Sequence, residues 1–360
     1  MAAVILIPAY NPNHLLVEYV SALVSFGFER ILVINDGSKA ECNVYFDRVR
    51  EFEQCDVITH EVNRGKGAAL KTGMSYYLEH YKGYDGIVTG DADGQHTLED
   101  TANLAGQLSK HPDALLLGSR VFTGDDVPKR SAFGNNLTSK VFHLFYGKKL
   151  GDTQTGLRAI PNALIEGFID LNGDRFEYEM NMLIMCADKK IDIIEFPIKT
   201  VYIDDNSSSH FNVIKDSVKI YWIILKRFIL YLVSGIISFI VDQGVYRLLI
   251  YILLPLLFAK ILKPETAASI YIATAVARVV SSVVNFFINK VFVFESKSKT
   301  TKSFVKYVIL VVGIMLTSAS LVWAISSITH WNSANVKIVV DALLVFVTYT
   351  LQRCWVFKKK

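Results

Sequence analysis

The sequence predicts an α/β domain with a mostly parallel sheet, followed by an all-α membrane domain of four helices. Up to about residue 205, short apolar runs alternate with stretches of helical spacing, a pattern typical of strands buried between helices. From about Tyr221 onward, the apolar runs are long enough to cross a bilayer. The 360 residues carry a net charge of +4 and are 51% hydrophobic, averages that conceal these two unlike halves.

Five continuously apolar runs are the predicted strands of the first half. They are "VILI" (4–7), "ILVI" (31–34), "VIT" (57–59), "GIVTG" (86–90) and "ALLLG" (114–118). Helical spacing appears between them, as in "HLLVEYVSALVSF" and "KGAALKTGMSYYLEH". About 200 residues are enough to bury one hydrophobic core.

Polar loops follow four of these strands. They are "PAYN" (8–11), "NDGS" (35–38), "HEVNRGKG" (60–67) and "DADGQ" (91–95). In parallel α/β folds, ligands bind at the carboxyl ends of the strands, so the four loops together predict a nucleotide-binding crevice. Asp36 in the second loop is well placed for a ribose or base contact, although it could also be an ordinary turn residue.

Asp91 and Asp93 follow a predicted buried strand and are expected to point into this crevice. Paired carboxylates need a compensating cation, and Mg²⁺ or Mn²⁺ bound to diphosphate oxygens fits this requirement. Such a metal would neutralise the charge that builds up on a departing nucleoside diphosphate. The alternative is a polar turn, in which Asp93 is a turn residue and Asp91 is a cap.

The stretch "NRGKGAALKTG" (63–73) favours ligand binding. Gly65 and Gly67 let backbone amides approach a ligand, and a helix begins immediately after them. Arg64 and Lys66 bring positive charge to the same place. The spacing is not that of a P-loop, and an ordinary helix start with two surface cations remains the alternative.

Taken in order, "IPAYN", "VINDGS", "NRGKGAALKTG" and "GDADGQH" resemble family 2 glycosyltransferases of the GT-A fold. Within that family the chain looks most like polyprenyl-phosphate hexose synthases of the dolichyl-phosphate mannose synthase type. The resemblance runs from residue 3 to about 205 and includes "GSR" (118–120), "KRSAFGN" (129–135), "DTQTGLRAI" (152–160) and "RFEYEMNML" (175–183). It implies a nucleotide-sugar donor. UDP-glucose is the first choice, by analogy with systems linked to the GtrA-like family, which the membrane half resembles (below), and UDP-N-acetylglucosamine and GDP-mannose are the alternatives.

The motifs and the resemblance together predict the residues of the site. Donor binding is assigned to Pro8, Tyr10, Asp36, Arg64, Lys66, Gly67, Asp91 and Gln95. Metal binding is assigned to Asp91 and Asp93, catalysis to Asp91, Asp93, Arg120 and Arg130, and acceptor binding to Arg120, Arg130, Asp152, Gln154 and Arg175. Many relatives carry an acidic residue just after "PAYN", where this chain has Pro12 and Asn13, which weakens any donor contact inferred there. The Gln-x-x-Arg-Trp motif of processive synthases is absent, which favours transfer of a single sugar.

A lipid-phosphate acceptor would explain why no catalytic base stands out. The acceptor is already an anion near neutral pH, because the second pKa of a phosphate monoester is about 6. The enzyme then needs cations and geometry, and Arg120, Arg130 and Arg175 suit that role because guanidinium binds phosphate through two parallel hydrogen bonds. Each could instead form a surface ion pair, Arg175 with Glu177 or Glu179.

The predicted boundaries are a cytosolic domain at 1–206, an amphipathic interfacial helix at 207–227 and a membrane domain at 228–360. In the interfacial segment, Lys215, Lys219 and Lys226 fall within about 40° of one another around a helix, which suits an anionic membrane surface. A solvated charged face is the alternative.

Four membrane spans are predicted, at 228–254, 266–289, 304–328 and 335–356. The cations of "ESKSKTTKS" (295–303) and of the tail "KKK" (358–360) place these segments in the cytosol. Because no cleavable signal pattern follows Met1, we expect a multi-pass plasma-membrane protein with a cytosolic N-terminal domain and C-terminus. Cys42, Cys55, Cys186 and Cys354 are expected to be free thiols there.

An internal repeat appears in the membrane half, where "NFFINKVFVF" (285–294) aligns with "TYTLQRCWVF" (348–357) at a shift of 63. These endings and "SGIISFIVDQGVYRLL" (234–249) resemble the GtrA-like family, which is associated with polyprenyl-linked sugars as partner or flippase. A plain membrane anchor, transfer to another lipid such as diacylglycerol, and a mainly transporting protein stay open. The expected partners are a nucleotide sugar, a polyprenyl phosphate and the membrane, with no nucleic acid and with a homo-oligomer left open.

Asp242 lies about midway along the first span and Arg278 about midway along the second. Ionised groups at that depth are costly and usually face a partner, so we predict an ion pair between them inside the bundle. Asp341 is expected nearer the outer surface. Arg247 is a poorer partner for Asp242 because residues five apart on one helix lie on diverging faces.

Overall fold

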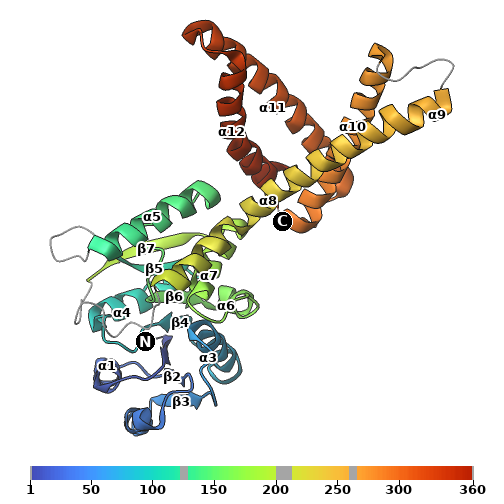
Figure 1. Ribbon diagram of the computed structural model, residues 1–360. Coiled ribbons are helices and arrows are strands. Elements are labelled where there is room, and N and C mark those ends of the chain that lie inside the picture. Colours follow the sequence, from blue (N-terminus) through green and yellow to red (C-terminus); the bar gives the residue numbers. More distant parts are fainter. Residues whose placement is uncertain (1, 122–128, 200–212, 259–265, 359–360) are drawn as a thin grey trace. The chain divides into compact units, whose positions relative to one another are not determined.

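The computed structural model describes residues 2–121, 129–199, 213–258 and 266–358, with only the backbone at 129–131, 213–215 and 257–258. The chain divides into two compact units, Met1–Ile224 and Leu225–Lys360 (Figure 1). The first unit is α/β and the second is helical, as the sequence predicts.

A seven-stranded sheet forms the centre of the first unit, in the order β3-β2-β1-β4-β6-β5-β7. The strands are β1 Ala3–Ala9, β2 Ile31–Asn35, β3 Cys55–Thr59, β4 Gly86–Thr89, β5 Leu115–Arg120, β6 Arg158–Pro161 and β7 Ile193–Ile198. Every neighbouring pair is parallel except those of β6, which runs antiparallel to β4 and β5. The structure therefore confirms the five predicted strands and the mostly parallel sheet, and it contains two further strands, β6 and β7, that were not predicted.

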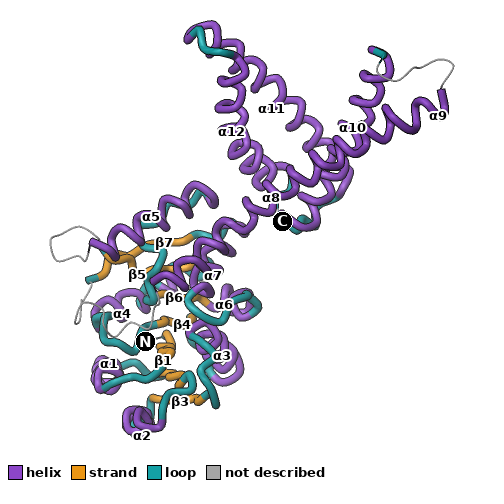
Figure 2. Tube along the Cα trace, viewed as in Figure 1, coloured by secondary structure: helices purple, strands orange, loops and turns teal. Residues whose placement is uncertain are grey.

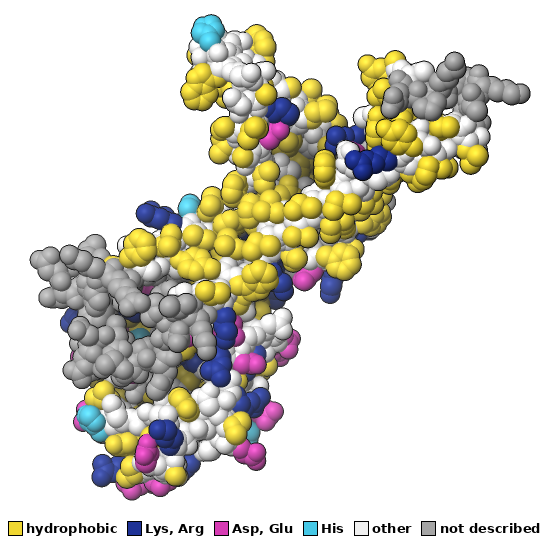
Figure 3. All heavy atoms as spheres, in the orientation of Figure 1, with side chains coloured by type: hydrophobic (Ala, Val, Ile, Leu, Met, Phe, Trp, Pro, Cys, Tyr) yellow, Lys and Arg dark blue, Asp and Glu magenta, His cyan; other side chains and the backbone are white. Residues whose placement is uncertain are grey.

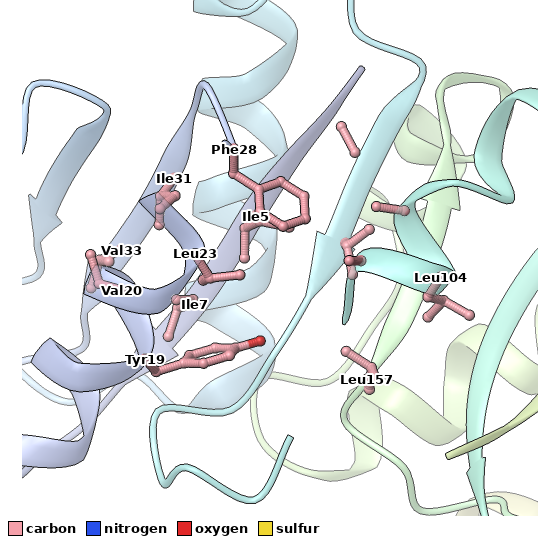
Figure 4. Packing of buried hydrophobic residues seen from close by; sticks show 14 of the residues in the cluster. Ile5, Ile7, Tyr19, Val20, Leu23, Phe28, Ile31, Val33, Leu104 and Leu157 are labelled. Carbon is pink, nitrogen blue, oxygen red and sulfur yellow. The ribbon is translucent and has the colours of Figure 1, made fainter. Parts of the chain in front are cut away.

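Helices flank this sheet (Figure 2). They are α1 His14–Phe26, α2 Asn43–Arg50, α3 Lys66–His80, α4 Leu98–Ala105, α5 Lys129–Tyr146, α6 Asn162–Ile169 and α7 Glu177–Lys189. Figure 4 shows Leu23 of α1 beside Ile5 and Ile7 of β1, all within one buried cluster. Leu6 points to the opposite face, where a Cβ on Gly73 of α3 would lie 2.2 Å from its Cδ1 atom. Alternate side chains of β1 thus bury the two faces under different helices.

The second unit is built from long apolar helices. They are the end of α8 Val213–Leu248, then α9 Leu254–Phe258, α10 Ala267–Ile288, α11 Thr300–Thr329 and α12 Ser333–Leu351. Four segments are long and apolar enough to cross a membrane: Asp216–Leu256, Ala267–Val293, Thr300–Thr329 and Ser333–Val356. Hydrophobic side chains cover most of their visible surface (Figure 3).

The predicted interfacial helix is not a separate element in the described residues. Its described part, from Val213, is the beginning of α8, which continues without a break into the first membrane span. The helix continues while its composition changes, because Lys226 and Arg227 are followed by a mainly apolar stretch from Phe228 without a break. The side chain of Lys215 lies outside the described residues, so the basic stripe stays a prediction.

The internal repeat is visible in the structure. Each copy ends in a five-residue π-helix, Asn289–Val293 in the first and Gln352–Val356 in the second. The first residues of these two helices are hydrogen-bonded to each other, with the amide nitrogen of Asn289 3.2 Å from the side-chain oxygen of Gln352. Phe294 and Phe357, also 63 positions apart, stack with their ring centroids 5.3 Å from each other. Two related helical hairpins therefore meet through equivalent residues.

The predicted ion pair at mid-span is present, with Arg278 Nε 3.6 Å from Asp242 Oδ1. Asp242 is buried and also accepts a hydrogen bond from the Ser281 hydroxyl. Only the Asp242 side of the pair is enclosed, because the side chain of Arg278 is 72% exposed. Asp341 lies about midway along α12 and is paired with Lys337 at 2.8 Å, and its position nearer the outer surface stays a prediction.

We expect Asp242→Leu to lower the thermal stability of the membrane domain more than the double change Asp242→Leu/Arg278→Leu. The single change leaves an unpaired guanidinium at mid-span, where a charge costs about 2.5–3.5 kcal/mol. Thermal unfolding in lipid nanodiscs measures the difference, with Lys337→Leu as a comparison for loss of a charge near the helix end. A double variant no more stable than Asp242→Leu would show that the two side chains do not depend on each other.

Candidate active site

Asp91 and Asp93 lie just beyond the carboxyl end of β4, next to the parallel strand β1. The Asp91 carboxylate has a partner at each oxygen, with Lys66 Nζ 2.7 Å from Oδ1 as its ion pair and His96 Nε2 3.4 Å from Oδ2. A Cβ on Gly156 would fall 2.2 Å from Asp91 Oδ2. Only glycine at that position lets the segment before β6 approach this carboxylate so closely.

The two aspartates are electrostatically unlike. Burial alone would raise the pKa of Asp91, but Lys66 and His96 outweigh it and hold the pKa well below its usual range. Burial, and then the charge of Asp91, raise the pKa of Asp93. Among the ion pairs of the described residues none involves Asp93, whose Oδ1 accepts only the backbone N–H of Gln95. Of the two carboxylates, Asp93 is therefore the one without a cation partner among the described residues.

Lys66 connects Asp91 to a second carboxylate that the sequence did not single out as part of the site. Its Nζ lies 3.2 Å from Glu179 Oε1, and Glu179 is buried at the start of α7. Arg158 of β6 is almost fully buried beside it and donates from Nη1 to the Glu179 carbonyl oxygen. The available signal was a glutamate inside the mostly apolar run "YEMNMLIMC", where a buried charged side chain needs a partner.

Asp36 holds the loop that precedes α3. Its Oδ1 accepts the backbone N–H of Arg64 at 2.9 Å, and its Oδ2 that of Gly65 at 2.7 Å. His60 Nδ1 lies 2.7 Å from Oδ1, and the carboxylate is buried. The described contacts of Asp36 are therefore internal to the protein, and its contact with a nucleoside stays a prediction.

We expect Asp36→Asn to lower the stability of the catalytic unit by about 1–3 kcal/mol, because an amide cannot accept both backbone N–H groups and the imidazole contact. The loosened loop should also weaken nucleotide binding. Thermal unfolding and UDP titration of the full-length protein measure the two effects. Asp47→Asn on exposed α2 is the matched control, and equal behaviour of the two variants would contradict the assignment.

Arg120 and Asp152 form a two-point ion pair, with Nε 2.6 Å from Oδ2 and Nη2 3.1 Å from Oδ1. The Asp152 side chain is fully buried, and its Oδ1 also accepts the backbone N–H of Gln154. Asp152 therefore fixes the orientation of Arg120, and its predicted place in the acceptor region stays a prediction. Arg130 lies in the first turn of α5, and its side chain is outside the described residues.

The other predicted site residues lie at loops of the same unit. Pro8 and Tyr10 are at the end of β1, and Gln95 follows Asp93 in the loop after β4. Arg64, Gln154 and Arg175 are exposed. A Cβ on Gly65 would lie 2.7 Å from Arg175 Cγ, so Arg175 packs on the 63–67 loop, and none of the described ion pairs joins it to Glu177 or Glu179.

The donor set at Asp91 and Asp93 fits a divalent cation shared with a diphosphate. Among the described residues no group of three or more His, Cys, Asp or Glu side chains could hold a metal by itself. Within the part of the chain that the structure describes, His96 Nδ1 is buried without a hydrogen-bond partner, and Nε2 faces Asp91 Oδ2 at 3.4 Å, so an imidazole nitrogen lies beside the carboxylates. A groove of about 530 Å³ along α3 contains Arg64 but neither aspartate, so it is not this site.

Comparison with known proteins gives two family matches. Residues 4–165 match the model "Glycosyl transferase family 2", and residues 230–357 match "GtrA/DPMS, transmembrane domain". The chain is 30% identical to the UDP-N-acetylglucosamine–dolichyl-phosphate N-acetylglucosaminyltransferase of Methanococcus voltae, over 58% of this chain and 89% of that protein. It is 27% identical to the dolichyl-phosphate beta-glucosyltransferase of Saccharomyces cerevisiae, over 56% of this chain and 67% of that protein.

Among solved structures, the chain is similar to glucosyl-3-phosphoglycerate synthase from Mycobacterium tuberculosis in complex with Mn²⁺, UDP and phosphoglyceric acid. The identity is 14%, the TM-score is 0.46, and the match covers 62% of this chain and 77% of that chain. At this distance no residue role or ligand is transferred from it.

Proposed function

The chain belongs to glycosyl transferase family 2 and carries a GtrA/DPMS transmembrane domain, and we propose that it moves one hexose from a nucleotide sugar to a polyprenyl phosphate. The strongest support is that one chain contains both a family 2 catalytic unit and four membrane-length helices. An enzyme that acts on a soluble acceptor would not need a membrane domain. UDP-glucose is the proposed donor, and UDP-N-acetylglucosamine is a second candidate, favoured by the relative from Methanococcus voltae.

The proposed mechanism needs no general base, because the attacking oxygen belongs to a phosphate that is already an anion at neutral pH. Asp91 and Asp93 would hold Mg²⁺ or Mn²⁺, which when bound supplies charge neutralisation at the leaving diphosphate. Arg120, oriented by the buried Asp152, offers a fixed cation for the acceptor phosphate. Arg175, which lies just before α7 and packs on the 63–67 loop, and Arg130 in α5 are proposed to assist it.

Two features support an acceptor at the membrane surface. In the first unit, α5 exposes Phe133, Leu137 and Leu144, which follow one another at helical spacing along a single face. Next to it, α8 exposes Trp222 near the start of the first membrane-length segment, and the hydroxyls of Thr138 and Tyr221 link the two helices at 3.2 Å. We propose that both helices rest on the membrane from which the acceptor is taken.

The proposed location is the cytosolic face of the plasma membrane. Lys297 and Lys299 lie between the second and third spans, and Lys302 lies in the first turn of the third. Cationic loops are retained on the cytosolic side. With four spans, the C-terminus then returns to the side of the catalytic unit. Chemical labelling of single cysteines introduced into this loop and into the loop near His330 tests the orientation.

The direct test is an assay of the purified full-length protein in vesicles that contain polyprenyl phosphate. We expect release of UDP together with a glycosylated lipid phosphate, and a panel of UDP-glucose, UDP-N-acetylglucosamine and GDP-mannose identifies the donor. Vesicles with diacylglycerol but no lipid phosphate should support no transfer. Movement of a lipid-linked sugar across the bilayer without any nucleotide release would overturn the transferase proposal in favour of a transporter.

A further inference from the structure

Lys66 is placed so that its ammonium can reach two carboxylates from one fixed backbone position. It is the first residue of α3, between Gly65 and Gly67. A Cβ on Gly65 would lie 2.3 Å from the Asp174 carbonyl oxygen, and one on Gly67 would lie 2.5 Å from Tyr178 Cβ. The backbone on both sides of Lys66 is therefore packed against the start of α7, and only its side chain is left to move.

The ammonium lies between Asp91 and Glu179, 2.7 Å from the first and 3.2 Å from the second. All three side chains are largely buried, with exposed fractions of 17% for Lys66, 28% for Asp91 and 10% for Glu179. A divalent cation that used Asp91 Oδ1 would compete with Lys66 for the same oxygen. Two cations cannot share that position, so Lys66 has to withdraw when the metal enters.

Glu179 provides the position to which Lys66 can withdraw. Its Oε1 already contacts the ammonium, and its backbone carbonyl is held by Arg158 Nη1 at 2.8 Å. Arg158 Nε lies 4.0 Å from the same Glu179 oxygen, so this carboxylate is fixed from the other side. A short side-chain rotation would keep Lys66 paired with Glu179 while leaving Asp91 to the metal.

We propose that Lys66 is an internal cation that compensates Asp91 until metal and nucleotide arrive, and that Glu179 is the positioning residue that then retains Lys66 beside the diphosphate. The inference rests on the proposed function, because it assumes that Asp91 and Asp93 receive a metal–nucleotide complex. It assigns Glu179 a part in the reaction cycle that requires no contact with either substrate.

The test is a titration of the full-length protein in detergent with Mn²⁺, with free Mn²⁺ measured by electron paramagnetic resonance, in the absence and presence of UDP. Without UDP, Lys66→Ala should bind Mn²⁺ about tenfold more tightly, the equivalent of removing one competing charged hydrogen bond. With Mn²⁺ present, the same variant should bind UDP about tenfold more weakly, because the diphosphate loses a cation. Glu179→Gln should weaken Mn²⁺ binding about tenfold, because Lys66 is then left on Asp91 alone.

The double variant Lys66→Ala/Glu179→Gln separates this mechanism from simple loss of charge. If Glu179 acts through Lys66, replacing it in the Lys66→Ala protein should leave Mn²⁺ affinity unchanged, whereas independent electrostatic effects would add. Lys71→Ala removes a cation from the same helix and Glu177→Gln a carboxylate from the same turn of α7, and both should bind Mn²⁺ like wild type. Lys66→Arg should restore the wild-type affinity, and comparable thermal unfolding of all variants shows that they fold.

If the wild type binds Mn²⁺ and the changes in Mn²⁺ affinity caused by Lys66→Ala and Glu179→Gln add in the double variant, the proposed role of Lys66 and Glu179 is wrong. The proposed function would not be affected by that result. A wild-type protein that binds no Mn²⁺ with or without UDP would overturn both the metal assignment and this inference.

Discussion

Asp93→Asn is expected to lower the rate of transfer by about a thousandfold while the protein stays folded, a loss comparable to that of one preorganised electrostatic group in other active sites. Asparagine has nearly the shape of aspartate but cannot neutralise a divalent cation. The fold does not depend on this charge, because burial and the neighbouring Asp91 raise the pKa of Asp93 in the folded protein. A carboxylate with a raised pKa destabilises the fold in its ionised form, so the amide should leave thermal stability unchanged or slightly higher.

This combination of lost activity and retained stability distinguishes a metal-binding aspartate from a turn residue. UDP release and thermal unfolding of the same preparations measure it, with Asp113→Asn on an exposed turn as the control. Chelation by EDTA should abolish transfer by the wild type, and added Mg²⁺ or Mn²⁺ should restore it. Undiminished turnover in EDTA, or an active Asp93→Asn protein, would refute the metal assignment.

Arg120→Ala is expected to impair both acceptor use and stability. Asp152 is fully buried, and removing its guanidinium partner leaves an uncompensated charge that costs about 3–5 kcal/mol. The Michaelis constant for polyprenyl phosphate should rise at least about tenfold, because a charged hydrogen bond to phosphate is lost. UDP affinity should change much less, since Arg120 lies on β5, away from the 63–67 loop.

The double variant Arg120→Ala/Asp152→Ala separates the two effects. Removing both charges should recover most of the lost stability but none of the acceptor affinity. Arg130→Ala should raise the Michaelis constant for the lipid phosphate in the same way, with UDP affinity less affected. If Arg120→Ala and Arg130→Ala both titrate lipid phosphate like wild type, the acceptor phosphate is bound elsewhere.

The sequence was sufficient for properties that depend on local pattern. Continuous apolar runs of three to five residues predicted the parallel strands, because a strand buried on both faces has no polar side to show. The order of polar loops after those strands predicted that Asp91 and the 63–67 loop would meet at one edge, and Lys66 does contact Asp91. The shift of 63 in the membrane half predicted two related hairpins, because identical helical patterns fold alike.

Strand β6 shows where local pattern failed. Its four residues Arg158–Pro161 begin with a charged side chain, so the apolar run is too short to be recognised as a strand. Its pairing with β4 and β5 in the antiparallel direction is fixed by the sheet around it. The same pairing brings Gly156 against Asp91 and Arg158 against Glu179.

The partners of charged side chains were decided only by the tertiary structure. Asp36 holds the 63–67 loop, Asp152 orients Arg120, and Glu179 shares Lys66 with Asp91. The sequence shows that these residues are acidic but not which partners they contact. Nor could the midpoint positions of Asp242 and Arg278 show that one would be buried and the other exposed. Hydrophobic burial follows periodicity along the chain, which the sequence displays directly. An ion pair instead requires two particular atoms to come within a few ångströms, and that depends on how distant segments pack against each other.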